Sequence, residues 1–157
     1  MRQIQIQKPG GLENLKLENV DSPNLANDEV LMKIYASSLN YHDLMVALGL
    51  IPTDDKRVPL SDGAGEILKV GSDVTRWKIG DKVMSVCFPN WVDGPPKYEL
   101  LSFIGDNEDG YAAEVIAIKE TALTKIPDNL SFFEAATLPC AGPVSYTHLT
   151  LPTKRIV

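Results

Sequence analysis

The chain is poor in cysteine and has no long apolar run. Cys87 and Cys140 are its two cysteines, and no short spacing relates one to the other. A disulfide framework and a zinc knuckle are therefore excluded, and a reducing compartment is favoured. No stretch approaches the roughly 18 apolar residues of a membrane span, and the N-terminal segment lacks the apolar core of a signal peptide. We expect a cytoplasmic protein with no membrane partner.

Basic residues are also few. The 15 Lys and Arg are outnumbered by 21 Asp and Glu, and the formal net charge is -6. Such a surface repels the phosphates of nucleic acids, so no nucleic-acid partner is expected. A strand–GxGxxG–helix unit, which would bind a dinucleotide, is missing as well. With 44% hydrophobic residues, the 157-residue chain can bury one ordinary core.

Short alternating segments separated by glycine and proline turns dominate what is present. Alternation of apolar and polar residues predicts strands over residues 4–7, 12–19, 29–37, 62–70, 83–87 and 111–118. Residues 40–48 change to helical spacing, with Asn40 as N-cap and Gly49 at the end. Ser131 and Glu134 form a capping-box pattern that predicts a second helix start. The fold class is mainly β with short helices, as a barrel or a sandwich.

Five stretches carry a resemblance to a known family. They are SSLNYHDLMVALGLIP, VPLSDGAGEILKVGSDVTRWKIGDKV, FPNWVDGPP, GYAAEVIAI and LSFFEAATLPCAG, and they cover much of residues 1–142. Together they resemble the N-terminal part of the medium-chain dehydrogenase/reductase superfamily, most closely the zinc-free quinone oxidoreductases and their alcohol-dehydrogenase-like relatives. The resemblance implies a GroES-like barrel with the start of a linker helix over residues 1–142. It also implies a Rossmann domain after them, which this truncated chain lacks.

The same resemblance bears on zinc. Zinc-dependent relatives hold a catalytic Cys where this chain has Asn40 and a His where it has Ser61, and their lobe of four cysteines is missing here. Amide and hydroxyl groups are poor Zn²⁺ ligands. We therefore expect no metal. Two alternatives stay open: a zinc-dependent alcohol dehydrogenase with unusual ligands, and a non-enzymatic GroES-like interaction module.

The last fifteen residues depart from the family. Residues 143–157, PVSYTHLTLPTKRIV, replace the continuation expected after Gly142, and residues 144–153 look like a translated sequencing adapter. We expect this segment to be non-native and assign no role to Tyr146 or His148. A natural C-terminal strand is the alternative, because several of its residues favour strands.

Asn40 and Tyr41 are the candidate catalytic residues. The resemblance places them in the cleft between the two domains, near the nicotinamide and the substrate carbonyl. There an amide or a phenol donates a hydrogen bond to the oxygen that gains charge. Helix capping explains Asn40 equally well, and Asp43 reads mainly as a first-turn acid that interacts with the helix dipole.

Further candidates surround these two. Asn40 and Thr137 are predicted to face the cofactor. Tyr41, Ser61, Phe88 and Trp91 are predicted to line the substrate pocket. Ser61 is as readily explained as part of a turn, and the aromatic residues as a loop that covers its own apolar patch.

Two reactive residue types have structural explanations. His42, the histidine outside the suspect tail, is expected at the solvated surface rather than in catalysis. Cys87 is expected to be a buried, inert thiol.

The expected function follows from the resemblance. We expect the chain to be the N-terminal fragment of a zinc-independent NAD(P)H-dependent oxidoreductase. The full-length enzyme transfers hydride to or from a small-molecule quinone, enone, carbonyl or alcohol, and is expected to be a homodimer. NADP or NAD is bound mostly by the missing domain, so this fragment by itself is expected to be inactive.

Overall fold

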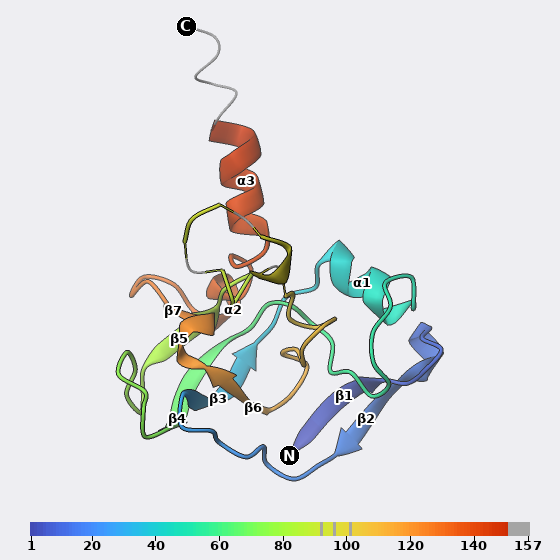
Figure 1. Ribbon diagram of the computed structural model, residues 1–157, viewed down its shortest axis with the longest axis horizontal. Helices are drawn as coiled ribbons and strands as arrows, with labels where there is room; N and C mark the ends of the chain where they lie inside the picture. The colour runs from blue at the N-terminus through green and yellow to red at the C-terminus, as the bar shows by residue number, and fades with distance from the viewer. Residues whose placement is uncertain (92, 96, 101, 151–157) are drawn as a thin grey trace, which may run out of the picture.

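The computed structural model describes residues 1–91, 93–95, 97–100 and 102–150, as a curved β-rich body with one helix projecting from it (Figure 1). Within these ranges, seven strands form two sheets. The smaller sheet pairs β1 (Arg2–Ile6) with β2 (Leu15–Asn19), and the larger has the order β6-β3-β4-β5-β7. Its members are β3 (Glu29–Ala36), β4 (Ala64–Val70), β5 (Lys82–Ser85), β6 (Val115–Lys119) and β7 (Leu123–Lys125). Every strand pairing is antiparallel in the described part of the chain.

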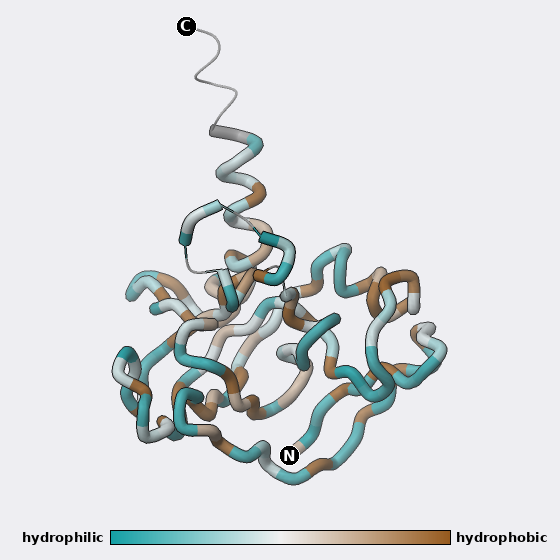
Figure 2. The backbone as a smooth tube through the Cα atoms, viewed as in Figure 1, coloured by the Kyte–Doolittle hydropathy of each residue, from teal (hydrophilic) through white to brown (hydrophobic). Residues whose placement is uncertain are grey.

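Strands of the larger sheet, predicted from alternation, carry the buried core. Val30 and Met32 of β3 are completely buried, as are Ile67 of β4 and Val83 of β5. These side chains pack together on one face of the larger sheet, because residues two apart on a strand point to the same face. In Figure 2 hydrophobic residues recur along these strands, whereas the outer turns are mostly hydrophilic.

Some strand limits differ from the prediction. The strand predicted from residue 111 is observed as β6, beginning at Val115. The residues before Val115 form separate backbone hydrogen bonds outside the strand ladder. For example, the Tyr111 N–H donates to the Leu60 carbonyl oxygen at 2.8 Å. β7 was not predicted at all, because three residues are too few to show alternation. It forms because β5 offers it an open edge.

Both predicted helix starts are confirmed. Helix α1 (Tyr41–Ala47) has Asn40 as N-cap in a capping box with Asp43, and Gly49 follows it with a φ of 76°. That positive φ suits glycine, which lacks a Cβ. Helix α2 (Phe132–Ala135) has the predicted capping box of Ser131 and Glu134. Short 3-10 turns complete the structure at η1 (Leu12–Asn14), η2 (Tyr98–Leu100) and η3 (Glu120–Ala122).

Helix α3 (Ala141–Thr150) extends away from the barrel (Figure 1). It continues through Gly142, the last residue of the predicted native domain. Pro143 fits in its first turn, where a missing N–H leaves no intrahelical bond unmade. The alternative of a C-terminal strand is wrong for residues up to Thr150, and residues 151–157 lie outside the described part. None of the described helices has the length and apolarity needed to cross a bilayer.

Candidate functional site

A hydrogen-bonded cluster joins the N-terminus of α1 to the segment before β4. The side-chain amide of Asn40 donates to Ser61 Oγ at 3.1 Å and to Asp62 Oδ2 at 2.9 Å. Both amide hydrogens are thus engaged within the protein. Ser61 is 2% exposed and Asp62 is completely buried. Asn40 therefore organises a buried polar centre in addition to capping the helix.

Asp43 connects the same two segments through the backbone. Its Oδ2 accepts from the Asn40 N–H at 2.8 Å, and its Oδ1 accepts from the Ser61 N–H at 2.9 Å. The first bond closes the capping box, and the second ties α1 to the chain entering β4. Asp43 therefore does more than the first-turn role expected of it. It positions Asn40 and Ser61 relative to each other.

Asp62 is the buried carboxylate of the cluster. Its Oδ2 accepts from Ser38 Oγ at 2.8 Å as well as from Asn40, and the backbone N–H of Cys140 also donates to the carboxylate. Its Oδ1 has no hydrogen-bond partner among the described residues. Burial raises the pKa of Asp62, and the hydrogen bonds from Asn40 and Ser38 oppose the rise. Desolvation of the charged form is the larger effect.

The raised pKa gives stability a defined pH dependence. Because the native state holds the proton of Asp62 more tightly than the unfolded chain, this group lowers stability as pH rises above about 4. The variant Asp62→Asn keeps an oxygen acceptor without the charge. We expect its stability relative to the original chain to increase from acid to neutral pH. Urea unfolding at several pH values measures this trend.

A matched control for that experiment is Asp128→Asn. The Asp128 side chain is 89% exposed, and its ion pair with Lys125 lies at the surface. Its relative stability should stay nearly constant over the same pH range. Equal pH trends for the two variants would contradict the assignment to Asp62.

Tyr41 lies beside a different, apolar cavity. Tyr41 is 76% exposed, and its hydroxyl takes part in no hydrogen bond among the described residues. Together with Asn40 it lines a cavity of about 570 Å³, whose other walls are mostly apolar and include Leu39, Leu44 and Leu60. The phenol is thus a free donor at the edge of an apolar space.

Phe88 and Trp91 line a second cavity, of about 600 Å³. Their rings meet edge to face with centroids 6.3 Å apart, and the cavity also contains Cys87 and Cys140. The two cavities share no lining residue. The predicted grouping of Tyr41, Ser61, Phe88 and Trp91 into one pocket is therefore not what the described residues form. Ser61 turns inward because Asn40 and Asp43 hold it.

Thr137 lines neither of these cavities. It is exposed, and its hydroxyl donates to the Glu134 carbonyl oxygen at 2.8 Å, one turn earlier in the chain. The hydroxyl is therefore part of the end of α2. A cofactor role for Thr137 remains a prediction.

His42 differs from its expected position at the solvated surface. Its Nε2 lies 3.0 Å from Asp106 Oδ2, and its ring lies 4.3 Å from that of Phe103. The histidine thus connects α1 to the 103–107 loop. Neither partner is near His42 in the sequence, so spacing offered no signal for this contact.

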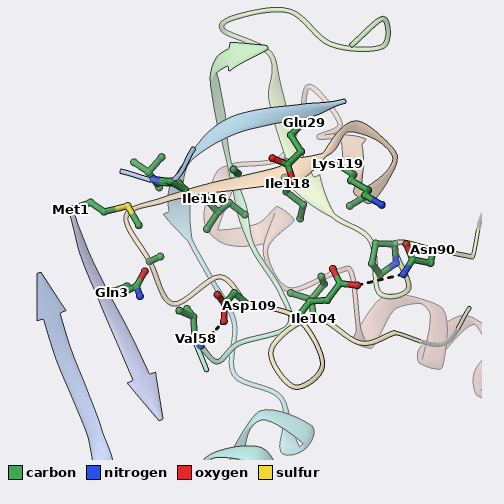
Figure 3. Close-up of a pocket in the computed structure, with 18 residues that line it drawn as sticks. Met1, Gln3, Glu29, Val58, Asn90, Ile104, Asp109, Ile116, Ile118 and Lys119 are labelled. Carbon is green, nitrogen blue, oxygen red and sulfur yellow. Dashed lines mark hydrogen bonds between the residues drawn. The ribbon is translucent and has the colours of Figure 1, made fainter. Parts of the chain in front are cut away.

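A third cavity, of about 220 Å³, lies under β6 (Figure 3). Ile104, Ile116 and Ile118 line it, and none of the predicted site residues does. The Val58 N–H donates to Asp109 Oδ1 at its edge. It is a space between the end of the barrel and the loop at residues 104–110, apart from the Asn40 cluster.

Two of the three side chains in the Asn40 cluster, Asn40 and Ser61, are poor zinc ligands. Within the described ranges, no three Cys, His, Asp or Glu side chains are placed to hold a metal ion. The polar groups of Asn40 and Ser61 are an amide and a hydroxyl, and the amide donates a hydrogen bond to the hydroxyl oxygen. Zn²⁺ prefers thiolate, imidazole and carboxylate.

The fold is a curved antiparallel arrangement of strands with short helices at its edge. Residues 26–128 match the family described as the alcohol dehydrogenase GroES-like domain. The chain belongs to this family, within the medium-chain dehydrogenases/reductases, and the predicted fold is confirmed.

Similar proteins include oxidoreductases. A zinc-type alcohol dehydrogenase-like protein of Schizosaccharomyces pombe is 42% identical over 143 residues, which are 88% of this chain and 41% of that protein. The 2-methylene-furan-3-one reductase of Solanum lycopersicum is 38% identical over 144 residues, 89% of this chain and 34% of its own. The quinone oxidoreductase from Coxiella burnetii superposes with a TM-score of 0.76 at 27% identity, over 96% of this chain and 44% of its own. The chain thus spans less than half of each.

Proposed function

We propose that this chain is the barrel part of a zinc-independent NAD(P)H-dependent oxidoreductase. The observation that carries the proposal is the cluster of Asn40, Ser61 and Asp62 in a chain of this family. Its members bind each other through hydrogen bonds, and two of them are poor metal ligands. The substrate is a small molecule: a quinone, an enone or other carbonyl, or an alcohol for the reverse reaction.

Within that enzyme the nicotinamide supplies the hydride, and this chain orients the substrate. Tyr41 donates a hydrogen bond to the substrate oxygen, because its hydroxyl is exposed and unengaged among the described residues. Asn40 holds Ser61 and Asp62 in place at the edge of the same cleft. Asn40 and Thr137 are proposed to face the cofactor in the cleft of the full-length enzyme.

A following domain supplies most of the cofactor site. The relatives are more than twice as long as their matching part, and the described strands form no parallel sheet around a glycine-rich loop. We propose that residues 1–142 are the native domain and that residues 143–157 are non-native. Cytoplasmic location and a homodimer of the full-length protein belong to the same proposal.

Genomic DNA beyond the codon for Gly142 tests this proposal. A coding region with a strand–GxGxxG–helix unit, in frame and replacing residues 143–157, is the expected result. A natural stop codon directly after Val157 would contradict it and would favour the alternative of a non-enzymatic interaction module.

The 157-residue chain itself is expected to bind NADPH with a Kd of about 1 mM or weaker, because the phosphate-binding glycines lie outside it. Isothermal titration calorimetry measures this affinity. Tight stoichiometric binding would show that the barrel carries the cofactor site. Zinc titration of the same sample is the second measurement: stoichiometric binding would favour a zinc-dependent alcohol dehydrogenase with unusual ligands.

A further inference from the structure

The two cysteines meet in the folded chain although they are far apart in sequence. Cys87 follows β5, and Cys140 directly precedes α3. Both are half-buried, and both line the 600 Å³ cavity that contains Phe88 and Trp91. The two thiols interact with each other, and this interaction favours the thiolate of Cys140 over that of Cys87. The fold thus creates a thiol pair that the sequence spacing did not indicate.

We propose that Cys87 and Cys140 are a redox modification site, which forms a reversible intramolecular disulfide by exchange with a low-molecular-weight disulfide such as glutathione disulfide. The bridge would join the end of β5 to the start of α3. The proposal is independent of the enzymatic function, because it needs neither a nicotinamide cofactor nor a following domain.

The exchange proceeds in two balanced steps. Cys140 is the better first nucleophile, because the interaction with Cys87 favours its thiolate. The Cys140 thiolate attacks one sulfur of glutathione disulfide, forms a mixed disulfide and releases one glutathione. Cys87 then loses its proton, attacks the Cys140 sulfur and releases the second glutathione. The two protein thiols lose two electrons in total, and glutathione disulfide gains them.

The cavity gives the reagent a route to the thiols. Its volume of about 600 Å³ is in the range of small-molecule sites. Arg76 lines the same cavity and supplies a positive charge for the carboxylates of glutathione. Trp91, at the wall of the cavity, is 37% exposed, so the cavity reaches the surface.

The surroundings make the exchange slow at neutral pH. Burial, followed by the neighbouring Cys140 and Asp62, raises the pKa of Cys87 to about 12. Burial and the charge of Asp62 also raise the pKa of Cys140, with Asp43 as a smaller contributor. Because the thiolate reacts, the rate should rise roughly tenfold for each pH unit below these pKa values. Arg76 is the cationic group lining the cavity, and Asp62 and Asp43 are the anionic groups acting on the pair.

The contact also connects this site to the buried polar cluster. The backbone N–H of Cys140 donates to the carboxylate of Asp62, which in turn accepts from Asn40. A bridge at Cys140 would therefore hold the segment that leads into α3 beside Asn40. Oxidation would restrict this segment without altering the barrel strands.

Incubation of the folded 157-residue chain with glutathione disulfide tests the proposal. Intact mass spectrometry should show the loss of two hydrogen atoms, with glutathione adducts as minor species. Tryptic digestion without reduction should give one cross-linked product, because Lys97, Lys119 and Lys125 separate the two cysteines in sequence. Dithiothreitol should restore the original mass.

The variants Cys87→Ser and Cys140→Ser are matched controls. Each should stop at a mixed disulfide, and Cys87→Ser should acquire its adduct faster than Cys140→Ser does. A stable glutathione adduct on the unsubstituted chain, or no modification at alkaline pH, would overturn the proposal. If a variant fails to fold, the unsubstituted chain still tests the proposal, because its cross-linked tryptic product shows the disulfide directly. Its formation only in urea would also overturn the proposal.

Discussion

Replacement of Gly65 with alanine is expected to destabilise the barrel by about 3 kcal/mol. A Cβ at this position would overlap the carbonyl oxygen of Lys33, and it would lie 2.9 Å from the carbonyl carbon of the same residue. Gly65 of β4 pairs with Ile34 of β3, and both strands lie inside the larger sheet with a neighbour on each side. The backbone cannot withdraw there without breaking the ladder.

Chemical denaturation of Gly65→Ala measures this loss, with Gly142→Ala as the matched control. A Cβ at Gly142 would have its nearest contact at 3.9 Å, with Leu138. Because alanine favours a helix more than glycine does, that variant should be neutral or slightly more stable. A cost for Gly65→Ala below about 1 kcal/mol would show that β3 and β4 separate more easily than the close contact implies.

Replacement of Asp43 with alanine is expected to cost about 3 kcal/mol, because two backbone N–H groups would lose their acceptor. These are the N–H of Asn40 and the buried N–H of Ser61. The carboxylate is 4% exposed, so water does not readily replace it. The variant should also release α1 from the segment before β4, which would disorder the Asn40–Ser61–Asp62 cluster.

Glu134→Ala is the matched control for Asp43. Glu134 accepts from the Ser131 N–H at 2.8 Å in the same capping-box geometry, but it is exposed and makes no hydrogen bond to another segment of the described chain. Its loss should cost about 1 kcal/mol or less. Thermal and urea unfolding of both variants gives the comparison. Equal losses would show that the bond from Ser61 to Asp43 adds nothing beyond helix capping.

Local patterns predicted most of the fold. Alternation located the strands β3 and β4, and the capping residues Asn40 and Ser131 marked the starts of α1 and α2. These features depend on contacts within a few residues, so a single sequence expresses them. β7 escaped prediction because its pairing with β5 is decided by a distant strand.

The candidate site was predicted less completely. The sequence left two explanations of Asn40 open, helix capping and a hydrogen bond to the substrate, and it gave no sign that the amide would donate to Ser61 and Asp62. Phe88 and Trp91 were grouped with Tyr41, yet they face another cavity. Which way a side chain points follows from its neighbours in space, and these come from separate segments.

The sequence by itself determined the class of fold, the two helix caps and the poor metal-ligand chemistry of Asn40 and Ser61. Only the tertiary structure decided that Asp62 is a buried carboxylate with one oxygen that lacks a partner among the described residues, and that the thiols of Cys87 and Cys140 interact. The reason is physical. Strand alternation and capping act over one or two turns of chain, whereas burial and thiol pairing arise when the closing sheet brings the end of β5 against the start of α3.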